Sequence, residues 1–235
     1  MLNKILDMLR KYFEIWQNVI ARPILFYTVM PKKNWKEDPL TFAAQSSWIL
    51  SFALTVTIFI TQYVPIGKYL VEGLSGIELL MVSPVVLTVA FVFFAMTYII
   101  LGGLVMGALL VLLLACASIE HVALKALGGK GDLKDMFSAF FYSGAVFVFG
   151  LVPSLLAILT KWHFLNFWQF TISENIIYYF SCLYIYGIWS IAGKKLHDVP
   201  RWKAFIAAAL PVLILIGINI VLSSKILPKI ENLFV

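Results

Sequence analysis

The segment Leu79–Ile119 reads LLMVSPVVLTVAFVFFAMTYIILGGLVMGALLVLLLACASI, forty-one consecutive residues without a charged side chain. Glu78 precedes this segment and Glu120 follows it. As one α-helix, at about 1.5 Å per residue, it would be about twice as long as the hydrocarbon core of a bilayer, which is about 30 Å thick. Because water does not tolerate such a helix in isolation, the number of times it crosses a membrane decides the topology of the whole chain.

The composition indicates an integral membrane protein. Of the 235 residues, 62% are apolar and only 13% are charged, whereas about 25% of the residues of a soluble domain are charged. The net charge of +6 comes from lysine and arginine flanking apolar segments, not from a basic stripe on a polar surface, so we expect no nucleic-acid partner. Cys116 and Cys182 lie in apolar segments, which is typical of packing residues.

The remaining chain divides into an amphipathic helix and a series of spans. Residues 1–22 place apolar side chains at helical spacing opposite charged ones, which predicts a helix. Two locations stay open: the plane of the membrane interface, or a position against the protein's own cytoplasmic loops. The spans are expected at about 43–64, 84–127, 136–160, 174–192 and 204–223.

Three regions follow from these elements. Residues 1–42 would form a cytoplasmic helix and linker, 43–225 a five-span membrane domain, and 226–235 a short tail. Ser83–Pro84 has the form of a helix start and would begin the second span. A basic cluster of Lys32, Lys33 and Lys36 precedes the first span.

A hairpin at Gly102–Gly103 would split the apolar run and give six spans instead of five. With five spans and a cytoplasmic N-terminus, 14 lysines and arginines lie inside and 4 outside; with six spans the split is 10 to 8. Because short cytoplasmic loops are enriched in Lys and Arg, the count favours five spans with the N-terminus inside and the C-terminus outside. The predicted fold class is therefore an all-α, polytopic membrane helix bundle.

Polar residues gather on the predicted cytoplasmic side. The Gly128–Gly131 cluster departs from the phosphate-binding P-loop pattern, and helix termination followed by a tight turn explains it. The candidate residues that face a partner or lipid are Gly128, Gly129, Lys130, Gly131, Lys194, Lys195, His197, Asp198, Arg201 and Lys203. Gly103 and Gly107, at small-xxx-small spacing, are candidates for helix packing.

Histidines and carboxylates on this side of the membrane are residue types that could form a metal site or a proton relay. In Glu120–His121 and in His197–Asp198 the two residues are adjacent, however, and adjacent helical residues do not face the same way. We therefore expect ordinary capping and pairing there, with no metal, no cofactor and no catalytic residue. An intramembrane enzyme would require His121, His197 and carboxylates to converge on one pocket.

Two stretches resemble the Yip1 family of five-span membrane proteins. One is Leu127–Asp135 (LGGKGDLKD), followed by Tyr142–Ser143, and the other is Leu196–Ala204 (LHDVPRWKA), leading to Leu210–Pro211. The chain departs from the family pattern near Val146, where a proline is expected. Eukaryotic members bind prenylated Rab-type GTPases and one another, partly through a long cytosolic N-terminal region. This chain has only about forty residues before its first span and is similar to short prokaryotic members, so the resemblance does not imply a Rab partner.

The resemblance and the charge pattern together predict a non-enzymatic protein of the cytoplasmic (inner) membrane of a prokaryote. It would organise the membrane or bind a partner through a basic cytoplasmic face. Expected partners are membrane lipids, a protein at the cytoplasmic face and a second copy of the chain. The alternative is a transporter, channel or lipid-translocating protein for a neutral or lipid substrate, with a path lined by the polar first span and the breaks at Pro153 and Pro211.

Overall fold

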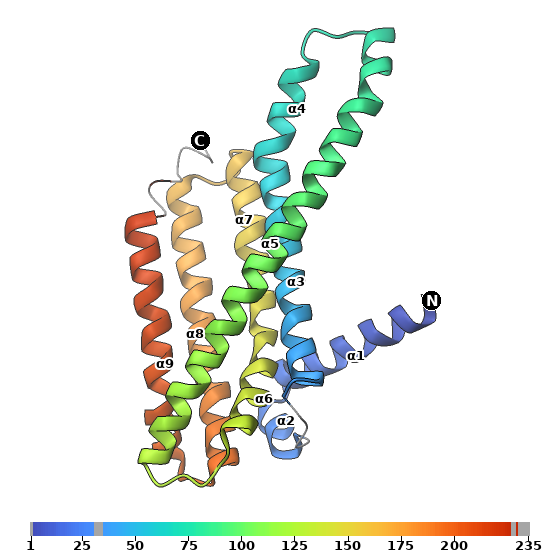
Figure 1. Ribbon diagram of the computed structural model, residues 1–235. Coiled ribbons are helices and arrows are strands. Elements are labelled where there is room, and N and C mark those ends of the chain that lie inside the picture. Colours follow the sequence, from blue (N-terminus) through green and yellow to red (C-terminus); the bar gives the residue numbers. More distant parts are fainter. Residues whose placement is uncertain (1, 31–34, 227–228, 230–235) are drawn as a thin grey trace.

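Five long helical segments run side by side in a computed structural model that describes residues 2–30, 35–226 and 229 (Figure 1). Each is long and apolar enough to cross a membrane, which confirms the predicted all-α, five-span bundle. Their bounds are Asp38–Val71, Ile77–Ala126, Leu133–Lys161, Phe167–His197 and Arg201–Lys225. Two lysines of the predicted basic cluster, Lys32 and Lys33, lie outside the described residues. So does the predicted tail beyond residue 226, except for Lys229.

The second span is one continuous helix, α5 (Ile77–Ala126), of 50 residues. It passes through the glycine pair without a hairpin, so the apolar run crosses once. Its predicted start at Ser83–Pro84 was wrong, because Pro84 lies inside the helix. Proline lacks the N–H that would bond to the Leu80 carbonyl, and the Ser83 hydroxyl donates to that carbonyl instead at 3.3 Å.

The first span is longer than predicted at both ends. It comprises α3 (Asp38–Ile58), the π-helical turn η1 (Phe59–Tyr63) and α4 (Val64–Val71). Residues 65–71, expected to lie outside the membrane or to be half-inserted, are therefore helical. The π turn ends two residues before Pro65, which has no backbone N–H to donate to the helical hydrogen-bond ladder. Together α4 and the first part of α5 project as an arm beyond the rest of the bundle (Figure 1).

The other three spans also extend beyond their predicted ends. The third consists of α6 (Leu133–Ser143), the 3₁₀ segment η2 (Gly144–Gly150) and α7 (Leu151–Lys161), so the irregular stretch precedes Pro153. The fourth, α8 (Phe167–His197), starts seven residues before the predicted Glu174, because Asn166 and Gln169 form a capping box there. The fifth is α9 (Arg201–Val221), which continues into the π turn η3 (Leu222–Ile226).

The N-terminal helix α1 (Leu2–Ala21) leads through Arg22 into the short α2 (Pro23–Val29). One face of these helices is bonded to the bundle: Trp16 donates to the Ala145 carbonyl at 3.0 Å and Tyr27 to the Ala139 carbonyl at 3.1 Å. These contacts cover only part of the apolar side of α1, and side chains such as Phe13 beside them remain exposed. The helix therefore packs on the spans themselves, and its exposed apolar side chains are still suited to the membrane interface.

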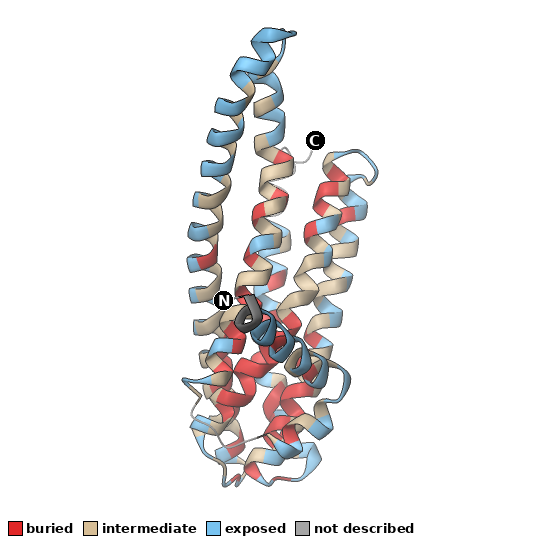
Figure 2. Ribbon diagram, turned by 90° about the vertical axis from the view of Figure 1, so that its right-hand side faces the viewer, coloured by how far each residue is buried: buried red, intermediate tan, exposed pale blue. Residues whose placement is uncertain are grey.

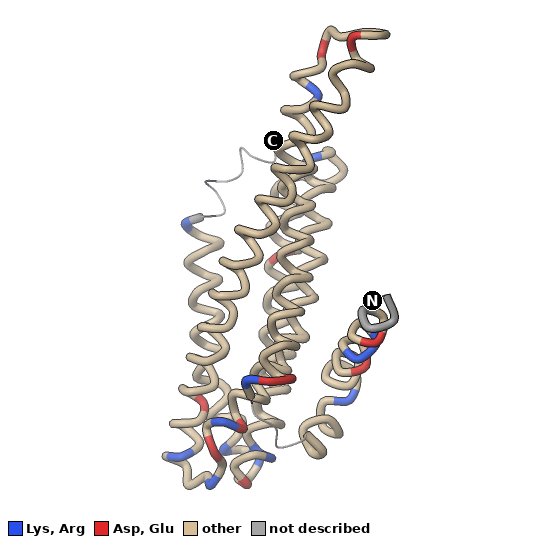
Figure 3. Tube along the Cα trace, turned by 45° about the vertical axis from the view of Figure 1, so that its right-hand side comes forward, with Lys and Arg blue, Asp and Glu red and all other residues tan. Residues whose placement is uncertain are grey.

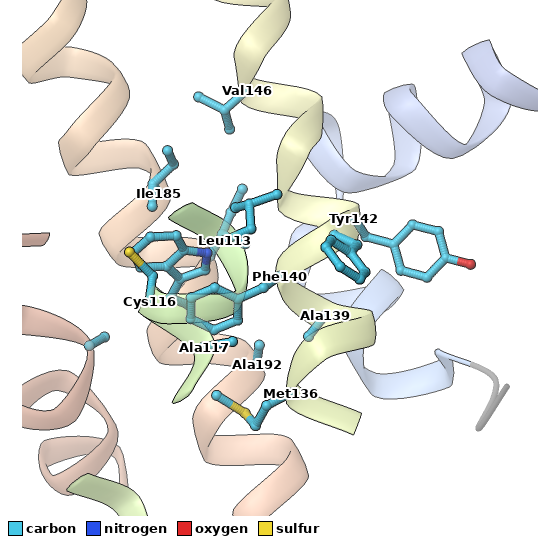
Figure 4. Close-up of a cluster of buried hydrophobic side chains, with 14 of the residues drawn as sticks. Leu113, Cys116, Ala117, Met136, Ala139, Phe140, Tyr142, Val146, Ile185 and Ala192 are labelled. Carbon is cyan, nitrogen blue, oxygen red and sulfur yellow. The ribbon is translucent and has the colours of Figure 1, made fainter. Parts of the chain in front are cut away.

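Burial is concentrated in one half of the bundle, while the arm of α4 and α5 is largely exposed (Figure 2). Figure 4 shows the cluster at the centre of the buried half, where side chains of α5, α6 and α8 meet. Trp189 stacks on Phe140 with ring centroids 4.3 Å apart and donates to the Ser143 hydroxyl at 2.9 Å. Cys116 and Cys182 are buried free thiols, as their apolar surroundings predicted.

Candidate functional site

The loop after α5 and the turn between α8 and α9 pack against each other at one end of the bundle. We call this end, residues 125–135 and 194–203, the basic end, since Lys and Arg gather there (Figure 3). The Lys130 N–H donates to the His197 carbonyl at 3.0 Å. Lys203 Nζ donates to the Leu127 carbonyl at 2.7 Å, so this predicted partner-facing lysine caps the end of α5. The structure thus joins the two stretches that the sequence singled out.

The glycine cluster closes this seam. A Cβ on Gly129 would lie 2.7 Å from His197 Nδ1, and a Cβ on Gly131 would lie 2.4 Å from the Leu196 carbonyl oxygen. Gly128 has φ +90°, a conformation that favours glycine at the end of a helix. Of the four residues of the cluster, Gly128 and Lys130 are exposed and remain available to a partner.

Two histidines meet beneath the seam. His121 Nδ1 of α5 and His197 Nε2 of α8 are 3.1 Å apart, within hydrogen-bond distance. Asp198 does not join them; it is exposed and ends α8 in the left-handed conformation, with φ +51°. The sequence placed both histidines on one side of the membrane but gave no signal for their contact.

Glu120 points elsewhere, toward α8. Its side chain is fully buried, and neither carboxyl oxygen has a hydrogen-bond partner among the described residues. A Cβ on Gly193 would lie 2.5 Å from Glu120 Oε1, so the glycine provides the space for this carboxyl. Sequence reasoning took Glu120 as the polar end of the apolar run and missed its burial.

The histidine pair and Glu120 do not form a recognisable metal centre. Within the described ranges, no three His, Cys, Asp or Glu side chains are grouped as a metal site requires. Glu120 and His121 face different ways, as the adjacency argument predicted. The enzyme hypothesis required His121, His197 and carboxylates to converge on one pocket. The structure brings the two histidines together, with the Asp132 carboxylate close enough to interact electrostatically with each, while Glu120 points elsewhere.

Three of the candidate cations share one depression. A pocket of about 290 Å³, the basic pocket, lies where α2, α8 and α9 meet. Its lining residues include Lys194, Lys195 and Arg201 together with Ser190 and Phe205. None of the three cations has a salt-bridge partner in the part of the chain that the structure describes. Lys195 and Arg201 are exposed and Lys194 is half-buried, so the pocket combines cations with apolar side chains such as Phe205.

The predicted packing glycines of α5 contact no other helix. A Cβ on Gly103 or Gly107 would have no neighbour within 4 Å, whereas a Cβ on Gly102 would lie 2.1 Å from the Trp48 ring. The glycine that permits close packing of α3 on α5 is therefore Gly102. Gly103 and Gly107 lie on the outer face, where contact with a second copy remains a prediction.

A second cavity, of about 240 Å³, lies inside the bundle. It is lined mainly by leucine, valine and aromatic side chains, with Pro153 and Glu174 at its wall. An apolar lining gives no support to a water-filled path. Transport of a neutral or lipid substrate therefore remains the alternative function, and this cavity does not supply a polar path for it.

Comparison with known protein families shows to which family this chain belongs. The model of the Yip1 domain matches residues 18–222. The chain belongs to the Yip1 family. Comparison with curated proteins and with solved structures gave no match. The Yip1 family is generally one of non-enzymatic membrane proteins.

The residues that carry the resemblance to the Yip1 family now have a physical explanation. The stretches Leu127–Asp135 and Leu196–Ala204 are the two sides of the seam at the basic end. Tyr142–Ser143 lies in the central core, where Ser143 accepts the Trp189 hydrogen bond. Val146, at the position of the missing proline, is buried in the 3₁₀ segment.

Proposed function

We propose that this Yip1-family protein is a non-enzymatic scaffold that organises the membrane or binds a partner through its basic end. The observation that carries the proposal is the packing of both family stretches at this end, beside three cations that have no described acidic partner. The amphipathic α1 supports the same role, because its exposed apolar face would insert at the interface. Within the proposal, the basic end is cytoplasmic in a prokaryotic inner membrane.

The orientation can be tested by cysteine labelling in intact cells. Ser75→Cys, in the turn between α4 and α5, is expected to react with a membrane-impermeant thiol reagent, whereas Lys130→Cys should react only after the cells are opened. The two native cysteines are buried, so their background should be low. Labelling of Lys130→Cys in intact cells would overturn the N-in, C-out orientation.

The scaffold role can be tested by site-specific photo-crosslinking in native membranes. A crosslinker at the exposed Lys195 is expected to capture one protein or lipid species reproducibly, and one at the exposed Leu80 on the arm should give several times less of it. Exchange of Lys194 and Arg201 for glutamine should reduce capture at Lys195. Equal products from both positions would contradict a role for the basic end.

A further inference from the structure

The basic pocket continues into an apolar groove on the outer face of α8. The groove has a volume of about 200 Å³, and its lining residues include Pro23 of α2 and Leu183, Gly187 and Ile191 of α8. Ile191 also lines the basic pocket, so the two hollows share a wall. A charged compartment thus leads directly into an apolar one.

A third hollow extends the same surface between α8 and α9. It has a volume of about 340 Å³ and is lined by apolar residues such as Leu183 and Leu213, with Cys182 and Tyr186. The Tyr186 ring contacts Phe205, which lines the basic pocket, with centroids 5.4 Å apart. This hollow therefore lies next to the basic pocket and shares Leu183 with the apolar groove.

The dimensions match one leaflet of a bilayer. From Lys194 to Leu183 the helix α8 rises about 17 Å, at about 1.5 Å per residue. Half of a hydrocarbon core about 30 Å thick is about 15 Å. A molecule with its charge at Lys194 and its apolar part along α8 would therefore reach about the membrane midplane.

We propose that the basic pocket and the apolar groove together bind one anionic phospholipid of the surrounding bilayer. Its phosphate lies among Lys194, Lys195 and Arg201, and an acyl chain follows the groove past Gly187. Basic pockets between spans are the usual form of sites for anionic headgroups. This inference rests on the proposed function, since it assigns the ligand of the same basic end.

The apolar groove distinguishes a phospholipid from an acidic protein segment. An acidic segment would satisfy the three cations, but it would leave the groove along Leu183 and Gly187 unfilled. The groove opens beside lipid-facing side chains, since Phe180 and Leu183 are 58% and 67% exposed. A bilayer lipid reaches this surface without leaving the membrane.

The test measures lipid selectivity of the full-length protein in vesicles of phosphatidylcholine with phosphatidylglycerol. Spin-labelled phosphatidylglycerol should be immobilised by the wild-type protein in preference to spin-labelled phosphatidylcholine. The triple variant K194Q/K195Q/R201Q should lower this preference by up to about a hundredfold, because each of the three surface cations contributes about fivefold. The matched control K68Q/K125Q/K134Q removes the same charge outside the pocket and should keep most of the preference.

A second variant tests the groove. Gly187→Leu should displace the chain and reduce binding of phosphatidylglycerol several-fold, since a Cβ there has no neighbour within 4 Å and the fold should tolerate it. Gly103→Leu, equally unobstructed but outside the groove, is the control. Unchanged binding in Gly187→Leu, or equal losses in both triple variants, would overturn the composite site.

Lipid selectivity and crosslinking, measured on the same variants, test the lipid site and the proposed scaffold role separately. Loss of a protein crosslinked at position 195 when Lys194 and Arg201 are exchanged for glutamine, with the lipid selectivity of K194Q/K195Q/R201Q intact, would overturn the lipid site and leave the scaffold role standing. Loss of lipid selectivity while Lys195 and Leu80 crosslink to the same products would support the site and contradict that role. Circular dichroism and size-exclusion profiles identical to the wild type confirm that each variant is folded.

Discussion

Replacing Gly131 with alanine is expected to lower the free energy of unfolding by about 3 kcal/mol. The added Cβ would lie 2.4 Å from the Leu196 carbonyl oxygen and 2.9 Å from its carbonyl carbon. Both are backbone atoms, so relief requires the two stretches of the seam to separate. Overpacking of this kind costs about 1–3 kcal/mol, and separation would also break the Lys130–His197 backbone hydrogen bond, worth about 1 kcal/mol.

Thermal unfolding of the purified protein in detergent measures this effect. Gly103→Ala is the control. It is the same glycine-to-alanine change, made inside α5 at a position where the new Cβ would have no neighbour within 4 Å. Its melting temperature should stay within a degree or two of the wild type, or rise slightly, since alanine is the better helix former. An unchanged melting temperature for Gly131→Ala would contradict the close seam.

The number of spans could be predicted because it depends on hydropathy and charge summed over whole segments of the chain. The charge-free run, and the excess of cations on alternate loops, do not depend on how the helices rotate. The predicted ends of the spans are less accurate: the first span continues through Pro65, beyond its predicted end at Val64, and Pro84 lies inside α5 instead of starting it. Inside a membrane bundle a helix continues through proline when other groups satisfy the freed backbone carbonyl, as Ser83 does for Leu80.

The candidate site could be predicted only in part, because contacts between distant helices carry no local signal. His121 and His197 are 76 positions apart, and their contact depends on the rotation of α5 and α8 about their axes. The sequence places the basic residues on one side of the membrane, and they do share one end of the bundle. It could not distinguish Lys203, which donates to the Leu127 carbonyl, from the lysines that line the basic pocket.

Replacing Glu120 with methionine is expected to raise the free energy of unfolding by about 1–3 kcal/mol. Methionine has nearly the same length, and it removes a buried carboxyl that has no hydrogen-bond partner among the described residues. A buried polar group without a partner costs about 1–3 kcal/mol, and apolar replacement removes that cost. Glu120→Gln, which keeps an unpartnered polar group of the same shape, should gain less.

Melting temperatures in detergent and in lipid vesicles give the comparison, with Glu72→Met at the exposed arm as the control. A rise for Glu120→Met and little change for Glu72→Met would show that Glu120 contributes nothing to stability. A fall of more than about 1 kcal/mol for Glu120→Met would contradict the expectation. Such a fall would mean that the Glu120 carboxyl, beside Gly193 of α8, stabilises the fold through an interaction that the described side chains do not supply.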